Sequence, residues 1–261
     1  MEKKKSLGQH FLKSQSALDA IVGALDPTAV DIVVEIGPGE GVLTEKILPL
    51  AAKVIAIEKD SRLIPLLQKK FAKYIEAGRF DLIEGDALEF DPAALQSYDL
   101  KKFDYKVVGN IPYYITGALL KKFLSETTQP STIVFLIQKE VAQRIARDKK
   151  ESILSLSVKA YGTPRYIKTV PAGAFSPPPE VDSAILAIQN ISRHTFADPA
   201  QEQKFFEIVR AGFAHKRKLL ARNLESVLGE QTLEAMRAAQ IPAKARAEEV
   251  DLTRWVSLTR Y

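Results

Sequence analysis

The sequence has 261 residues, a formal net charge of +5 and no cysteine. The lack of cysteine excludes a disulfide framework and a thiolate zinc site, and the three histidines lie too far apart for metal-ligand spacing. No stretch resembles a signal peptide or a membrane span, so we expect a cytoplasmic protein without a metal centre. A chain of this length can bury one substantial α/β core and leave enough residues for a small appendage.

Short apolar segments alternate with helical patterns along most of the chain. After a first helix at Ser14–Leu25, the expected strands are Ile32–Ile36, Val54–Glu58, Phe80–Glu84, Tyr105–Gly109, Ile133–Gln138, Arg165–Val170 and Ala184–Gln189. This alternation is typical of an α/β protein whose mainly parallel sheet is covered by helices on both faces. Beyond about Ile191 helices are expected at Gln201–Ala214, Lys218–Leu228, Glu230–Ala239 and Asp251–Ser257. We therefore predict two domains, residues 1–190 and 191–261.

Three glycines at every second position, Gly37, Gly39 and Gly41, follow the first strand. Such a turn lets backbone amides approach a ligand where a side chain would collide. The dinucleotide fingerprint needs its last glycine one place further on, and position 42 is Val, so the turn is not shaped for a pyrophosphate. S-adenosylmethionine has no pyrophosphate and suits this turn. Glycines that serve only the turn itself are the alternative.

Acidic residues stand at the ends of the next two strands. Glu58 ends the second strand, where a carboxylate can accept hydrogen bonds from both ribose hydroxyls of a nucleoside. Asp86 follows the third strand in Gly85-Asp86-Ala87 and could accept the adenine amino group. Taken singly, each is equally a solvated strand-end acid or a turn residue. Successive strand ends with suitable groups favour a ligand site, because ligands bind at the carboxyl ends of such sheets.

The fourth strand leads into Asn110-Ile111-Pro112-Tyr113. An adenine amine is a poor nucleophile because its lone pair is delocalised into the ring, so an enzyme must hold it in line and accept its hydrogens. The Asn110 side-chain oxygen and the Ile111 carbonyl can do both, and Tyr113 can stack on the base. In isolation the segment is equally a proline turn with a half-buried tyrosine. After the glycine turn and two acids, it predicts a methyltransferase.

With the opening Gly8-Gln9-His10-Phe11-Leu12 and the run from Phe175 to Ser183, these motifs resemble the bacterial ribosomal RNA adenine dimethyltransferases over nearly the whole chain. The resemblance implies a Rossmann-like class I methyltransferase fold with a seven-stranded sheet and a small all-α carboxyl-terminal domain. It implies S-adenosyl-L-methionine as cofactor and two adjacent adenosines near the 3′ end of 16S rRNA as the target.

The resemblance also implies roles for particular residues. Phe175 would face Tyr113 across the target base, although ordinary core packing is the alternative for Phe175. The catalytic residues would be Asn110, Ile111, Pro112, Tyr113 and Phe175. The cofactor contacts would come from His10, Leu12, Gly37, Gly39, Glu58, Asp86, Ala87 and Asn110.

Two basic clusters are expected to contact RNA phosphates: Lys3, Lys4 and Lys5, and Lys216, Arg217 and Lys218. We expect a monomer that binds 16S rRNA within the small ribosomal subunit or its precursor and has a role in ribosome biogenesis. One alternative is an adenine methyltransferase of large-subunit 23S rRNA, which shares the catalytic motifs. Another is a small-subunit assembly factor that chiefly binds.

Overall fold

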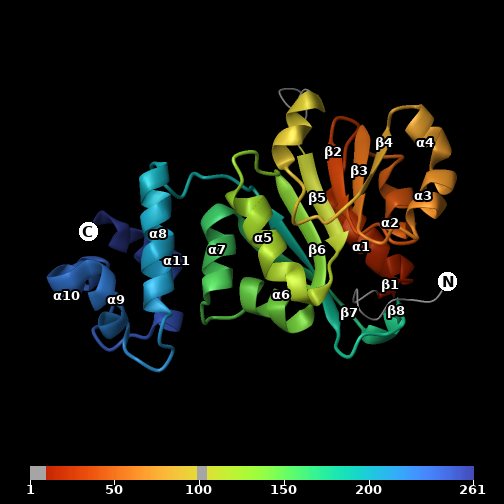
Figure 1. The fold of residues 1–261 in the computed structure, drawn as a ribbon. Coiled ribbons are helices and arrows are strands. Elements are labelled where there is room, and N and C mark those ends of the chain that lie inside the picture. Colours follow the sequence, from red (N-terminus) through yellow and green to blue (C-terminus); the bar gives the residue numbers. More distant parts are fainter. Residues whose placement is uncertain (1–9, 99–104) are drawn as a thin grey trace. The chain divides into compact units, whose positions relative to one another are not determined.

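The computed structural model describes residues 10–98 and 105–261. Lys3, Lys4 and Lys5, which we expect to contact RNA, lie outside the described residues. The chain divides into two compact units (Figure 1). The first takes the chain up to Ala142 together with Pro164–Ile191, and the second takes Gln143–Thr163 and Ser192–Tyr261. No helix among the described residues is long and apolar enough to cross a membrane.

A seven-stranded sheet forms the centre of the first unit. Its strands are β2 (Ile32–Ile36), β3 (Lys53–Glu58), β4 (Phe80–Glu84), β5 (Tyr105–Asn110), β6 (Thr132–Gln138), β7 (Thr163–Val170) and β9 (Ser183–Gln189). They lie in the order β4-β3-β2-β5-β6-β9-β7. β2 to β6 pair in parallel, whereas β9 runs antiparallel to β6. The mainly parallel α/β fold and the seven predicted strands are therefore confirmed.

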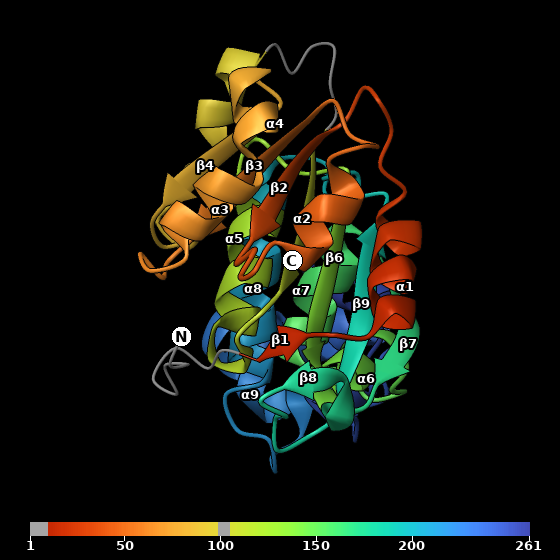
Figure 2. The ribbon, with the colours of Figure 1, turned by 90° about the vertical axis from the view of Figure 1, so that its right-hand side faces the viewer.

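Helices cover both faces of this sheet, which explains why its central strands are continuous apolar runs rather than alternating ones. α1 (Gln15–Leu25) and α2 (Val42–Ile47) lie on one face, and α5 (Thr116–Ser125) lies on the other (Figure 2). All five residues of β2 are buried as a result. The remaining helices of this part of the chain are α3 (Ile64–Lys70), α4 (Ala72–Glu76) and α6 (Lys139–Ala146), which crosses into the second unit.

The direction in which strands are added changes at β2, which has β3 on one side and β5 on the other. The carboxyl ends of β2, β3, β4 and β5 meet at one edge because these strands are parallel. In open α/β sheets, ligands bind outside the carboxyl ends of the strands at such a switch point. The fold therefore places the turns after these strands where a ligand is expected.

A second, two-stranded sheet joins the beginning of the described chain to the proline run. β1 (Phe11–Leu12) pairs antiparallel with β8 (Phe175–Ser176), with Phe11 opposite Ser176 and Leu12 opposite Phe175. The Lys13 amide also donates to the Ala174 carbonyl at 2.8 Å. Two-residue strands are too short to show a hydrophobic period, so the sequence did not predict this sheet.

The second unit is helical. It contains α7 (Ile153–Tyr161), α8 (Pro199–Gly212), α9 (Leu220–Leu228), α10 (Thr232–Ala238) and α11 (Leu252–Ser257). The four helices predicted beyond residue 191 are confirmed as α8 to α11. Trp255 of α11 is fully buried, stacks with Phe213 at the end of α8 and donates its ring N–H to the Val250 carbonyl at 3.0 Å. α7 belongs to this unit although its residues lie within the predicted domain 1–190.

The turn between β2 and α2 depends on glycine at position 41. Gly41 has a φ of 75°, in the left-handed region that glycine adopts most readily. A Cβ atom there would lie 2.6 Å from the Phe71 ring and 3.1 Å from Leu67. Gly41 therefore allows the turn to pack against α3 and the segment that follows it.

Replacing Gly41 by Ala should lower the free energy of unfolding by about 2–4 kcal/mol, because it adds both backbone strain and overlap with Phe71. Urea unfolding of the variant measures this loss. Gly23→Ala is the matched control, since Gly23 lies inside α1 with no atom within 4 Å of the added Cβ. That substitution should raise the free energy of unfolding by about 0.5–1 kcal/mol. Equal effects of the two substitutions would contradict this account of Gly41.

Candidate functional site

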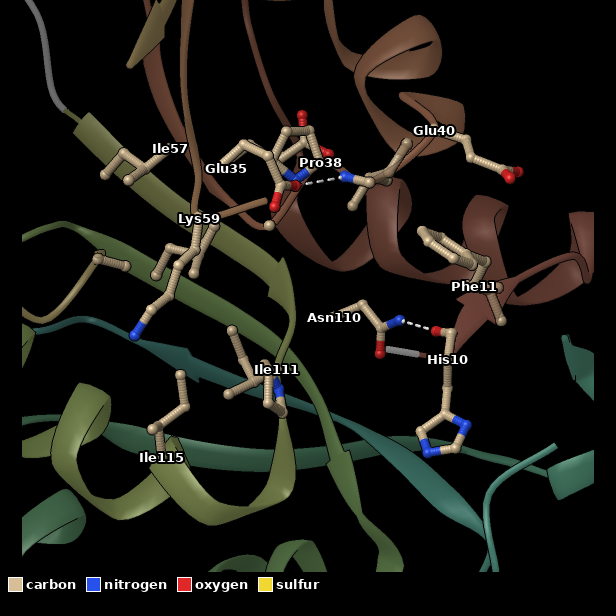
Figure 3. A pocket seen from close by; sticks show the side chains of 18 of the residues that line it. His10, Phe11, Glu35, Pro38, Glu40, Ile57, Lys59, Asn110, Ile111 and Ile115 are labelled. Atoms are coloured by element: carbon tan, nitrogen blue, oxygen red, sulfur yellow. Dashed lines mark hydrogen bonds between the residues drawn. The ribbon is translucent and has the colours of Figure 1, made fainter. Parts of the chain in front are cut away.

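A cavity of about 440 Å³ lies at the carboxyl edge of the sheet in the first unit (Figure 3). Its volume is in the range of small-molecule sites. Every predicted cofactor and catalytic residue lines it: His10, Leu12, Gly37, Gly39, Glu58, Asp86, Ala87, Asn110, Ile111, Pro112, Tyr113 and Phe175. Lys216, Arg217 and Lys218 lie in the second unit, between α8 and α9. The strand-end motifs thus come together in one cavity.

The glycine turn contributes Gly37 and Gly39 to the cavity wall, whereas Gly41 is not among the lining residues. Gly39 has a φ of 60°, and a Cβ atom there would lie 3.0 Å from the Phe11 ring. The Gly39 amide donates to Glu58 Oε2 at 3.0 Å. This glycine therefore lets Phe11 pack closely on the turn and holds the carboxylate at the end of β3.

Glu58 is buried at the cavity and held through both carboxylate oxygens. Oε2 accepts from Gly39, and Oε1 accepts from the Asp60 amide at 2.8 Å. Burial raises the pKa of the Glu58 carboxyl, and the backbone hydrogen bonds oppose that rise. Each carboxylate oxygen has a further lone pair. Glu58 is thus a rigidly oriented acceptor that keeps capacity for a ligand.

Asp86 forms an ion pair with Lys59, a residue that was not among the predicted site residues. Lys59 Nζ lies 2.6 Å from Asp86 Oδ2, and the Leu88 amide donates to Oδ1 at 2.9 Å. The hydrogen bond from Lys59 lowers the pKa of the Asp86 carboxyl, so it stays ionised at neutral pH. The only sequence signal for Lys59 was its position directly after Glu58. Asp86 is therefore an oriented acceptor in the same wall.

Glu35, within the glycine motif, was not predicted as a site residue but also lines the cavity. It is 1% exposed, and Thr44 Oγ1 donates to its Oε2 at 2.7 Å. Burial raises the pKa of the Glu35 carboxyl to about 7, and the hydrogen bond from Thr44 opposes that rise. Near neutral pH the Glu35 carboxyl is therefore a mixture of its protonated and ionised forms.

Asn110 ends β5 with its amide group oriented by the chain that precedes β1. Its Nδ2 donates to the His10 carbonyl at 2.7 Å, as Figure 3 shows. This hydrogen bond leaves Oδ1 as an acceptor. The next peptide is fixed as well, because the Ile111 amide donates to the Leu136 carbonyl at 3.0 Å. The motif thus begins with an immobilised acceptor at the cavity.

Tyr113 begins a short 3₁₀ turn, Tyr113–Ile115, and is held by neighbours from two other segments. Its hydroxyl lies 2.9 Å from Ser183 Oγ. The His10 imidazole is stacked with its ring, with centroids 6.5 Å apart, and His10 Nδ1 donates to the Pro177 carbonyl at 2.8 Å. Phe175 lines the cavity and also belongs to the hydrophobic core. The rings of His10 and Tyr113 therefore lie together in the cavity wall, and Phe175 contributes to the same wall from the core.

The fold is a mainly parallel seven-stranded sheet with a glycine turn after β2. Hydrogen-bond acceptors stand at the carboxyl ends of the next strands: Glu58, Asp86 and Asn110. Together these features define the Rossmann-like methyltransferase class. Solved structures agree. A dimethyladenosine transferase from Plasmodium falciparum matches with a TM-score of 0.78 and 29% identity, over 95% of this chain and 96% of that one. The 23S rRNA methyltransferase ErmE has the same TM-score at 23% identity, over 96% and 98%, and shows the same fold.

The family model described as Ribosomal RNA adenine dimethylase matches residues 1–261. The chain therefore belongs to the ribosomal RNA adenine dimethylase family. Ribosomal RNA small subunit methyltransferase A from Dehalococcoides mccartyi (strain CBDB1) is 42% identical over 99% of this chain and 88% of the relative. The protein of that name from Lactiplantibacillus plantarum is 38% identical over 99% and 90%. The resemblance seen in the motifs is confirmed.

The raised pKa of Glu35 predicts a pH-dependent stability. Between about pH 4.5 and pH 7 the unfolded chain releases the Glu35 proton while the folded chain keeps it, so this side chain destabilises the fold increasingly as pH rises. Glu35→Gln should not lose stability in this way. Across that pH range its free energy of unfolding should rise by about 3 kcal/mol relative to that of the unsubstituted protein. Urea unfolding at several pH values measures the difference. Glu45→Gln, which removes an exposed acid from α2, is the control, and parallel pH profiles for Glu35→Gln and the original chain would contradict the prediction.

Proposed function

We propose that this protein is an S-adenosylmethionine-dependent enzyme that dimethylates two adjacent adenosines near the 3′ end of 16S rRNA. Family membership over the full chain supports an rRNA adenine dimethyltransferase, and the names of the relatives support the small subunit. The observation that carries the proposal is the Asn110 amide, which lines the cavity beside the glycine turn and whose Nδ2 is bonded to the His10 carbonyl, so that its oxygen is the acceptor. We place this activity in the cytoplasm, with a role in ribosome biogenesis.

The cavity fits S-adenosylmethionine. Its wall combines backbone approach at Gly37 and Gly39 with the buried acids Glu35 and Glu58, which suit a ligand that carries a positive charge. We assign Glu58 to the ribose hydroxyls and Asp86 to the adenine amino group. His10, Leu12, Gly37, Gly39, Ala87 and Asn110 complete the contacts. When bound, the cofactor supplies an electrophilic methyl group.

The chemistry assigned to the chain is positioning rather than strong base catalysis. Asn110 Oδ1 and the Ile111 carbonyl accept the two hydrogens of the adenine amine, which directs its lone pair toward the methyl donor. Pro112 stiffens the turn between them and the aromatic side chains. The methylated amine is acidic enough to lose its proton to a weak acceptor. Tyr113 stacks on the base, and Phe175 is assigned to its other face.

Contacts with the RNA backbone are assigned to the two basic clusters. Lys216, Arg217 and Lys218 are all exposed, and they follow one another in the turn between α8 and α9. Lys3, Lys4 and Lys5 complete the assignment from the sequence alone. Contacts of this kind bind phosphates without reading sequence. Selection of the target adenosines is therefore left to the cavity and to the shape of the RNA.

The direct test is methyl transfer from labelled S-adenosylmethionine to small ribosomal subunits that lack the dimethyladenosine mark, with product sites mapped by mass spectrometry. We expect two adjacent dimethyladenosines near the 3′ end of 16S rRNA and no transfer by Asn110→Ala. Label on 23S rRNA would replace the proposed substrate with that of the large-subunit methyltransferases. Cofactor binding without label on any ribosomal particle would contradict the proposal and favour a binding-type assembly factor.

The assigned roles of Tyr113 and Glu58 predict different kinetic defects. Tyr113→Ala should raise the KM for RNA or lower kcat by removing stacking worth about 1–3 kcal/mol, with cofactor affinity nearly unchanged. Phe175→Ala should do the same if Phe175 covers the other face of the base. Glu58→Ala should weaken cofactor binding first. Calorimetric titration with S-adenosylhomocysteine, beside steady-state kinetics, separates these defects, and the reverse pattern would exchange the two roles.

A further inference from the structure

The run from Phe175 to Ser183 ends in a residue that the proposed function leaves without a role. Ser183 is the first residue of β9 and is 1% exposed. A buried hydroxyl needs a hydrogen-bond partner, because an unpaired polar group in the interior is costly. The partner is Tyr113, whose hydroxyl oxygen lies 2.9 Å from Ser183 Oγ. A serine 70 positions away in the chain thus contacts the tyrosine assigned to the target base.

This hydrogen bond acts at the far end of the Tyr113 side chain. A tyrosine side chain turns about two bonds. A hydrogen bond at its hydroxyl restricts the first rotation, χ1, because the hydroxyl oxygen moves with it, whereas this oxygen lies on the axis of the second rotation, χ2. Burial raises the pKa of the Tyr113 phenol, so the hydroxyl stays protonated at neutral pH and the bond persists there. The His10 imidazole lies against the ring itself. Ser183 therefore fixes the direction in which the Tyr113 side chain extends, and the stacked His10 ring restricts rotation of the Tyr113 ring about its own axis.

The residue before Ser183 fixes the segment that carries the second aromatic side chain. Asp182 Oδ1 accepts from the Ala172 amide at 3.1 Å, close to the start of the segment that leads to Phe175. The Asp182 carbonyl accepts from the Lys139 amide at 3.0 Å, which anchors it to the end of β6. The beginning of β9 therefore holds both Tyr113 and the approach to Phe175.

We propose that Ser183 is a positioning residue that orients Tyr113 for the target base through the hydrogen bond between their hydroxyls. This inference rests on the proposed function, in which Tyr113 stacks on adenine. Ser183 itself touches neither the base nor the cofactor in this role. The competing interpretation is that the Ser183 hydroxyl only forms a structural hydrogen bond that stabilises the buried core.

A double-mutant cycle tests the role, because Ser183→Ala and Tyr113→Phe remove the same hydrogen bond from opposite sides. Each single variant should lower kcat/KM for RNA about fivefold, the effect of one neutral hydrogen bond, and leave the Kd of S-adenosylhomocysteine unchanged. The double variant should be no worse than either single variant. Ser183→Thr, which keeps a hydroxyl, should recover most of the lost kcat/KM.

Tyr105→Phe is the matched control. Tyr105 is a buried tyrosine whose hydroxyl donates to the Thr128 carbonyl at 2.7 Å, and it begins β5 at the end remote from Asn110. Its loss should lower Tm without changing kcat/KM. If Ser183→Ala behaves in the same way, or if its effect adds to that of Tyr113→Phe, Ser183 serves only the core and the proposal is overturned.

A readout that needs no activity separates this inference from the proposed function. In protein labelled with ¹³C at the tyrosine Cζ, Tyr113→Phe identifies the Tyr113 signal by its disappearance. That signal should shift in Ser183→Ala and stay in place in Tyr105→Phe. An unmoved signal overturns the positioning role even if the original enzyme methylates small subunits. If the Tyr113 signal shifts in Ser183→Ala but the original protein does not methylate rRNA, the contact between Ser183 and Tyr113 stands and the proposed function is wrong.

Discussion

Parallel pairing of β2 with both β3 and β5 is the constraint on which the site depends. Ile36, the last residue of β2, pairs with Ile57 on one side and Gly109 on the other. The residues that follow these three are Gly37, Glu58 and Asn110, which the register therefore sets side by side at the carboxyl edge of the sheet. Residues up to 73 positions apart in the sequence are thus brought to one edge by the pairing of the backbone strands.

The same edge determines the electrostatics of the cavity. Glu35 and Glu58 lie at or next to the ends of strands that are covered on both faces, and burial raises the pKa of both carboxyls. Glu58 is stabilised there by backbone amides from the turns after β2 and β3, and Asp86 is stabilised by a lysine. The acids are thus held rigidly in a partly desolvated wall, where their interaction with a cationic ligand is stronger than in water.

Most of the fold, and the residues at the strand ends, could be predicted from sequence because each apolar run fixes a strand and parallel strands bring their carboxyl ends together. The β1–β8 pair could not, since two residues show no period. Neither could the ion pair of Lys59 with Asp86 or the contact of Tyr113 with Ser183, because side-chain pairs between distant segments leave no local pattern. Gly41 shows the opposite case, a motif glycine that packing against Phe71 explains without a ligand.

The segment before and within β1 connects the parts that register alone does not join. The His10 carbonyl orients the Asn110 amide, the His10 ring bonds to the Pro177 carbonyl, and Phe11 packs on Gly39. Because Asn110 Nδ2 is already bonded to a backbone oxygen, turning the amide over would bring two oxygens together and break that bond. The amide oxygen is therefore an oriented acceptor at the cavity. In the proposed function, this short segment would remove the cost of orienting the acceptor during the reaction, which is the form of catalysis that a weakly nucleophilic amine requires.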